Sequence, residues 1–190
     1  NTGKAIDISS TGDITMSASL NLATDAALAL ESTTGAMTLT GAIISGTGAI
    51  SLTSVGGLTL SDSADISSMN GALTFTSNAG HITMNDQTIV KAGSGQVALS
   101  AANNVTLGKL STAFVGDFTI TATSGEVIDS GDGQLDIDAA GANLVVTSAT
   151  GLGNSDSIDA NVASIDLVNT TSGLVQLINN GALDIDRISQ

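Results

Sequence analysis

Several residue types are missing or scarce in this chain, and each absence argues against a class of protein. The 190 residues include no cysteine, proline, tryptophan or tyrosine, and only four lysines and arginines together. Without cysteine there is no disulfide framework, and a single histidine does not supply a zinc site. Four cations cannot neutralise a track of phosphates, so we expect no nucleic-acid partner. No apolar run reaches the ~18 residues that a transmembrane helix needs, so we expect no membrane insertion.

Small aliphatic and polar residues make up most of the chain instead. Hydrophobic residues account for 42% of it, glycine occupies 22 positions, and 18 acidic residues give a formal net charge of −14. This apolar content is sufficient for a packed core, which distinguishes the chain from a disordered acidic tail. The first residues show neither an initiator methionine nor an apolar signal region. We therefore expect 1–190 to be a single segment of a longer repeat array.

Short strings recur in which a turn residue precedes an apolar–polar–apolar triplet. The first apolar positions of one series are Ile14, Met37, Leu58, Ile82 and Val105, with steps of 23, 21, 24 and 23 residues. The corresponding positions of a second, interleaved series are Ile50, Leu73, Val97 and Phe118. A third, looser set of apolar residues fills the gaps. A period of roughly 23 residues is typical of solenoid repeats, and three strings per period predict three short strands.

The alternation within each string predicts how the strands bury their apolar sides. It places Ile14 and Met16 on one side of a strand and Thr15 on the other. A strand this short cannot bury that side alone, but stacked coils can join such residues into continuous columns. We therefore predict an all-β, single-stranded parallel β-helix (β-solenoid) of roughly eight coils, each about 23 residues long and the whole ~40 Å tall.

Two further features of the fold can be predicted. We expect right-handed coiling from the general chirality of parallel crossovers. We expect glycine, asparagine and aspartate at the corners to supply the positive φ angles of sharp bends. An antiparallel sandwich or barrel is the alternative, although neither requires a fixed period of this length.

The first series also predicts a row of outward threonines along one side of the solenoid. Its members are Thr15, Thr38, Thr59, Thr83 and Thr106. The strand propensity of a β-branched polar residue explains such a row without any ligand. An ice-binding face would instead need paired Thr-x-Thr columns on one flat side. Such pairs occur at Thr38/Thr40, Thr74/Thr76 and Thr119/Thr121, and the repeat does not place them in adjacent coils of one face.

Acidic residues gather in one short stretch, which makes them weak candidates for a Ca²⁺ site. They are Asp129, Asp132, Asp136 and Asp138. Ca²⁺ takes about six to eight oxygen ligands, which carboxylates and turn carbonyls can provide. However, neither the calcium-binding nonapeptide nor the EF-hand loop is present. We interpret these residues as solvated surface charge and expect no cofactor.

No arrangement in the sequence predicts catalysis. His81 is the only histidine, and no Gly-x-Ser-x-Gly nucleophile elbow accompanies it. The carboxylate pairs Asp136/Asp138 and Asp184/Asp186 are expected on outward strand faces, and the four cations are scattered over the chain. A polysaccharide lyase or hydrolase is therefore the least favoured interpretation, and we expect no enzymatic activity.

Four of the strings resemble the repeats of large bacterial surface adhesins of the filamentous haemagglutinin type. The strings are Gly-Ala-Met-Thr-Leu-Thr at 35–40, Gly-Ala-Ile-Ser-Leu-Thr at 48–53, Gly-Gly-Leu-Thr-Leu-Ser at 56–61 and Gly-Ala-Leu-Thr-Phe-Thr at 71–76. The resemblance implies export to the bacterial cell surface, long β-helical stalks, and roles in adhesion or biofilms. It carries over no site residue.

The sequence thus predicts a structural stalk or fibre segment of an extracellular bacterial surface protein. Its expected partners are adjoining repeats or copies of itself end to end, with a cell or matrix surface as a further partner. A solenoid that binds ice through the threonine row, or Ca²⁺ through the acidic corners, is the alternative.

Overall fold

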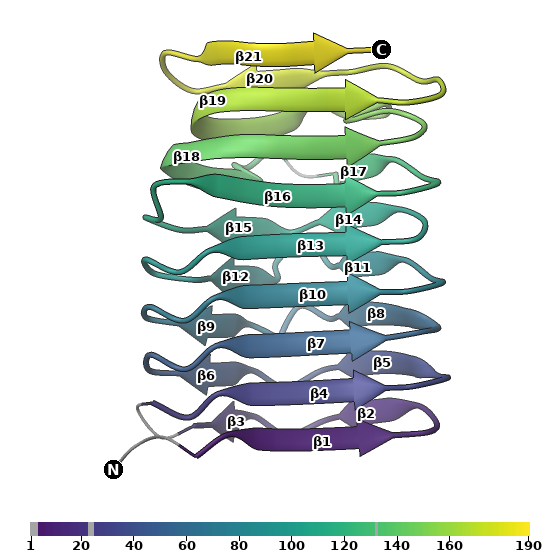
Figure 1. Cartoon of the computed structure of the whole chain (residues 1–190), viewed down its shortest axis with the longest axis vertical. Coiled ribbons are helices and arrows are strands. Elements are labelled where there is room, and N and C mark those ends of the chain that lie inside the picture. The colour runs from purple at the N-terminus through teal and green to yellow at the C-terminus, as the bar shows by residue number, and fades with distance from the viewer. Residues whose placement is uncertain (1–3, 23–24, 132) are drawn as a thin grey trace.

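The structure, a computed structural model, describes residues 4–22, 25–131 and 133–190, which wind into a parallel β-solenoid. These residues form 21 strands and no helix. In Figure 1 the nearer strands run from left to right and the farther ones from right to left, while the chain rises from the N-terminus at the bottom. This path is a right-handed helix, as predicted.

Each coil has three sides, which we call the front, side and back faces. The front face of the lower coils contains β1 (Ile6–Ser10), β4 (Leu28–Ser32), β7 (Ile50–Ser54), β10 (Leu73–Ser77), β13 (Val97–Ala101) and β16 (Asp117–Ala122). The side face contains β2 (Ile14–Met16), β5 (Ala36–Leu39), β8 (Gly57–Leu60), β11 (Ile82–Met84), β14 (Val105–Leu107) and β17 (Val127–Asp129). The back face contains β3 (Leu20–Asn21), β6 (Ile43–Ser45), β9 (Ile66–Ser68), β12 (Ile89–Lys91) and β15 (Lys109–Ser111).

The predicted vertical file of apolar residues is confirmed on the side face. Ile14, Met37, Leu58, Ile82 and Val105 are partners in successive parallel pairings, and the file continues through Val127 to bridges at Leu152 and Val175. On the front face, the partners Ile6, Leu28, Ile50 and Leu73 are separated by 22, 22 and 23 residues. The period read from the sequence is therefore the length of one coil.

The inward side chains of the three faces form one continuous core. Leu52, Phe75 and Leu99 stack in the front column with at most 1% of their surface exposed, and Leu58 and Ile82 face them from the side column. Full burial of such a side chain contributes roughly 1.5–3 kcal/mol. Because every coil contributes the same columns, the core extends along the axis.

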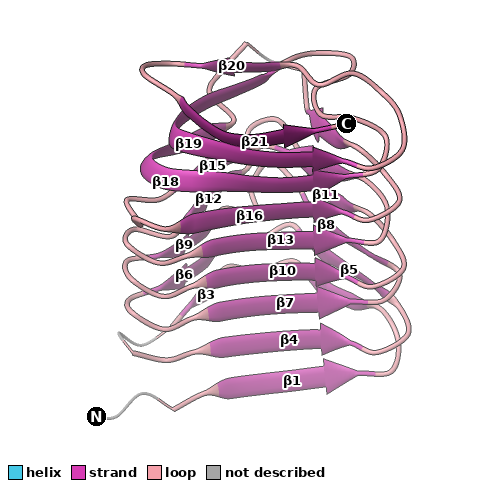
Figure 2. Cartoon of the chain, turned by 45° about the horizontal axis from the view of Figure 1, so that its top comes forward, coloured by secondary structure: helices cyan, strands magenta, loops and turns pink. Residues whose placement is uncertain are grey.

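The upper coils depart from three short strands per coil. β18 (Ile137–Ser148) and β19 (Ile158–Asn169) each run from the back face onto the front face as one curved strand of 12 residues, as Figure 2 shows. Their register shifts between Ala139 and Asn143, where the intervening residues are Ala140, Gly141 and Ala142. Small residues permit a bend inside a strand, so no separate corner turn is needed there. β20 (Leu177–Asn179) and β21 (Asp184–Ser189) complete the top.

The corner residues partly contradict the expected positive φ angles. No described residue other than glycine has a positive φ, so asparagine and aspartate do not serve in this way. At the corner column of Gly48, Gly71 and Gly95, glycine is required by close approach instead. A Cβ atom on Gly71 would lie 2.1 Å from the carbonyl oxygen of Gly48 in the coil below, and Gly95 has the same relation to Gly71. Backbone packing between coils therefore selects glycine at this corner.

Candidate functional site

The predicted threonine row exists as one ladder on the side face. Thr15, Thr38, Thr59, Thr83 and Thr106 are partners in consecutive coils, and Ile128 follows them in the next coil. Thr15 and Thr59 are exposed, while the other three are half-buried. The ladder therefore presents hydroxyl and methyl groups at the strand spacing of ~4.8 Å.

The front face carries a second set of outward hydroxyl groups, which were not predicted from the sequence. One outward column contains Thr53, Thr76, Ser100, Thr121 and Thr147 in consecutive coils. The column beside it contains Ser51, Thr74, Ala98, Thr119 and Val145. Thr74/Thr76 and Thr119/Thr121 thus share one face, with the coil of Ala98 and Ser100 between them. These ten positions carry no charge, although Glu31 lies below them and Asp166 above.

The described acidic candidates accept separate hydrogen bonds and are not arranged around a common centre. Asp129 Oδ1 accepts the backbone N–H of Gly131 at 2.9 Å, and Asp138 Oδ1 accepts an Nδ2–H of Asn161 at 2.9 Å. Asp132 lies outside the described residues. In the part of the chain that the structure describes, no group of three or more histidine, cysteine, aspartate or glutamate side chains is arranged to hold a metal ion.

The interpretation of Asp136 as solvated surface charge is wrong. Asp136 directly precedes β18 and is only 3% exposed. Its Oδ2 atom accepts the backbone N–H of Asp159 in the coil above at 2.8 Å, and its own N–H donates to Asp159 O at 2.9 Å. The carboxylate therefore joins two coils.

Asp159 is a residue that the sequence analysis missed. Its Oδ1 atom is buried and has no hydrogen-bond partner. It lies in the same back-face column as Asp136 and below Ile178 of β20. The signal that could have found it is the roughly coil-length spacing between two acidic residues, Asp136 and Asp159, that each precede a short apolar alternation.

A cavity of about 330 Å³ lies on the back face beside the acidic stretch. Its lining includes Asp86, Lys109, Ser130 and Asp136, so charges of both signs face it. Ser130 Oγ lies 3.5 Å from Asp86 Oδ1, the outer limit of a hydrogen bond. The cavity is adjacent to coil-joining contacts, and its polar side chains fit a structural role.

His81 and the terminal acidic pair also take structural positions. His81 is exposed on the side face, and its Nδ1 atom accepts the N–H of Asn104 in the coil above at 3.2 Å. Asp184 and Asp186 are exposed in β21, where Asp186 is the extra residue of a bulge between the pairs Ile165–Ile185 and Asp166–Arg187. Such a bulge adds one unpaired residue to the strand and bends it locally.

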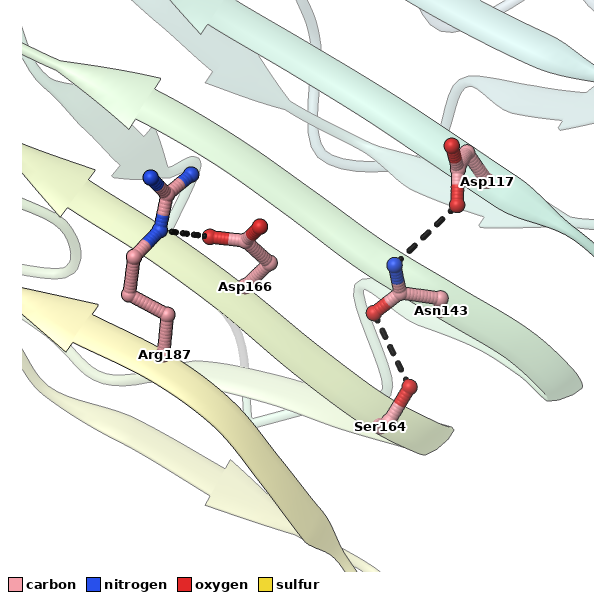
Figure 3. Close-up of polar contacts among 5 residues, drawn as sticks. All are labelled: Asp117, Asn143, Ser164, Asp166 and Arg187. Carbon is pink, nitrogen blue, oxygen red and sulfur yellow. Dashed lines mark hydrogen bonds and ion pairs between the residues drawn. The ribbon is translucent and has the colours of Figure 1, made fainter.

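Polar side chains on the upper front face form contacts from coil to coil. Figure 3 shows Asn143 donating from Nδ2 to Asp117 Oδ1 at 3.0 Å while its Oδ1 accepts Ser164 Oγ–H at 2.9 Å. In the same view Arg187 Nε lies 2.6 Å from Asp166 Oδ1. Each of these contacts follows the solenoid axis, so they reinforce the stacking of coils.

Comparison with known proteins gave no match among family models, curated proteins or solved structures. The resemblance to surface adhesins therefore rests on the repeat strings. Among the described residues there is no helix of the length and apolarity needed to cross a membrane. The described residues present rows of hydroxyl groups on the side and front faces and polar contacts between coils.

Proposed function

We propose that this chain is a structural stalk or filament segment of an exported bacterial surface protein, without catalytic activity. The observation that carries the proposal is the uninterrupted stacking of parallel coils around apolar columns that reach both ends of the molecule. A solenoid of this kind holds two points at a fixed separation because each coil contacts only its neighbours along one axis.

The ends of the columns support continuation of the rod. Half-buried apolar residues lie at the lower end, including Ile14 and Leu20, and at the upper end, including Val175 and Leu183. Strand edges that are left open at a solenoid end are normally capped or extended. Adjoining repeats or further copies of the chain fit this requirement.

The surface charge is compatible with an extracellular rod. The net charge of −14 repels neighbouring rods laterally and favours solubility. Placement on a bacterial cell surface, and a role in adhesion or biofilms, follow from the adhesin-like repeat strings.

Rigidity can be tested by distance measurement because the chain contains no native cysteine. Spin labels on Ser9→Cys and Ser189→Cys would occupy one front-face column at opposite ends. We expect a narrow distance distribution centred near ~40 Å, from eight strand spacings of ~4.8 Å. A broad distribution would contradict a distance-holding role. Antibody labelling of intact producing cells tests the location, and labelling only after lysis would contradict surface display.

Ice binding is a second candidate, supported by the regular hydroxyl rows of the side and front faces. Thermal hysteresis that disappears in Thr59→Lys or Thr76→Lys would support it. No hysteresis from the unchanged chain at millimolar concentration would eliminate it.

A further inference from the structure

The apolar columns of the front face end in exposed isoleucines at both ends of the solenoid. At the lower end Ile6 and Ile8 of β1 are 36% and 50% exposed, and at the upper end Ile185 and Ile188 of β21 are 62% and 53% exposed. Between the ends the same columns are buried, as at Leu52. Within this chain, each of these terminal front-face strands is paired on one side only, β1 with β4 and β21 with β19.

The two terminal strands occupy equivalent positions. Following the parallel pairings upward, Ile6 leads to Ile185, Asp7 to Arg187, Ile8 to Ile188 and Ser9 to Ser189. β1 and β21 thus present isoleucine to the same two inward columns and serine to the same outward column. Either strand satisfies the pattern of the front face.

The number of stacked strand positions on each face, here called levels, limits how two copies can join. Within the described residues the front face has nine levels, contributed by β1, β4, β7, β10, β13, β16, β18, β19 and β21. The back face has eight, contributed by β3, β6, β9, β12, β15, β18, β19 and β20. The side face also has eight, its six strands and the bridges at Leu152 and Val175. If both terminal strands stayed in a joint, a gap one strand high, ~4.8 Å, would open on the back and side faces.

Only one of the two terminal strands, β21 of the lower copy or β1 of the upper copy, can occupy the front-face position at the joint, and charge favours β21. If β21 left, Asp7 of the upper copy would lie directly beside Asp166, and like charges at neighbouring strand positions are destabilising. If β21 stays, Arg187 remains paired with Asp166 at 2.6 Å. The next residue in that column is then Ala29 of β4.

We propose that two copies of this chain associate end to end, with β21 of one copy pairing in parallel with β4 of the next in the place of β1. This inference rests on the proposed role as a rod segment and names its partner as a second copy. β2 of the upper copy then meets the Val175 level of the lower one, so Ile14 and Val175 continue the side-face file. The joint is a strand addition between unlike surfaces, so it repeats without closing and gives linear filaments.

Replacing β1 of the upper copy by β21 of the lower copy exposes little apolar surface and buries more at the joint. The side chains of β1 are exposed from Ile6 to Ser9, so its release uncovers a small apolar area. The joint covers Ile185 and Ile188 and the half-buried side-face residues at both ends. Burial of apolar area is the main favourable contribution to such association.

Sedimentation over a concentration series, with negative-stain imaging, tests the joint. The unchanged chain is expected to form linear oligomers. Ile188→Lys in β21 should weaken association at least tenfold, whereas Ile8→Lys in β1 should leave it unchanged or strengthen it. Ile89→Lys, at a back-face position that is 42% exposed and lies in β12, in the middle of the solenoid, is the matched control and should change nothing. Circular dichroism checks that each variant is folded.

Cross-linking identifies the neighbouring strand without disturbing the isoleucines. The pair Ser189→Cys with Glu31→Cys should give a covalent ladder on oxidation, because the joint places those positions side by side in different copies. The pair Ser189→Cys with Ser9→Cys should not. A ladder only from the second pair, or loss of association in Ile8→Lys equal to that in Ile188→Lys, would overturn the exchange. A chain that stays monomeric at millimolar concentration would also overturn it, and a narrow label distance in that monomer would leave the rod proposal standing.

Discussion

Gly71 donates its backbone N–H to Ser68 Oγ at 2.8 Å, at the corner between the back and front faces. The same hydroxyl lies 3.1 Å from the carbonyl oxygen of Gly48 in the coil below and donates its proton there. Ser68 thus closes its own corner and fastens it to the preceding coil. It is buried, so neither backbone group has solvent as a substitute partner.

We predict that Ser68→Ala lowers the free energy of unfolding by about 1–3 kcal/mol, the cost of leaving buried backbone groups without a partner. Ser77→Ala is the matched control, because Ser77 is also a buried inward serine but its Oγ atom has no hydrogen-bond partner. It should be neutral or stabilising by up to about 1 kcal/mol. The next coil already has Ala101 at that position. Urea denaturation measures both variants, and equal losses would contradict the assignment.

Gly71→Ala should be destabilising for a different reason. The added Cβ would lie 2.1 Å from Gly48 O, so two coils would have to separate locally. Overpacking of this kind costs about 1–3 kcal/mol. Gly12→Ala is the control, because a Cβ at Gly12 meets no heavy atom within 4 Å. A change beyond about 0.5 kcal/mol in Gly12→Ala, or none in Gly71→Ala, would show that close approach does not select glycine at this corner.

The repeat predicted the lower coils well because their structure is determined by local alternation and a constant period. Ile14 and Met37 fall in one file since each is the first apolar residue of a similar string, and no long-range information is needed to align them. The inward and outward positions of Thr15 and Met16 follow from the same alternation. Strand identity and coil length were therefore readable from the sequence.

The upper coils and the polar contacts were less predictable because they depend on register between dissimilar segments. The bend from Ala139 to Asn143 replaces a corner turn, and nothing in the lower repeats resembles it. The burial of Asp136 and the pairing of Arg187 with Asp166 both depend on which residue lies one coil away. The front-face hydroxyl columns were not predicted for the same reason. The coil between Thr76 and Thr121 has Ala98 and Ser100 at the outward positions, so the Thr-x-Thr pattern does not repeat from coil to coil.

Burial along one front-face column should determine the cost of truncation. Leu52 and Ile8 occupy the same column, but Leu52 is 0% exposed and Ile8 is 50% exposed. We expect Leu52→Ala to cost about 2–5 kcal/mol through lost contacts and a cavity. Ile8→Ala should cost less than about 1 kcal/mol. Guanidinium denaturation of dilute monomer measures both. Similar losses would mean that the terminal coil is as tightly packed as the middle.

Asp159→Asn should stabilise the upper coils. The Oδ1 atom of Asp159 is buried without a partner, and the residue lies directly above the buried Asp136. An amide removes one of two neighbouring negative charges and supplies a donor, so we expect a gain of about 1 kcal/mol. Asp184→Asn, on the exposed strand β21, is the control for a general reduction of negative charge and should change stability by less than about 0.5 kcal/mol. Thermal and urea unfolding at constant ionic strength measure both. A loss of stability in Asp159→Asn would show instead that the carboxylate itself is required. If added Ca²⁺ then raised the stability of the unchanged chain but not that of the variant, a bound cation would be the reason.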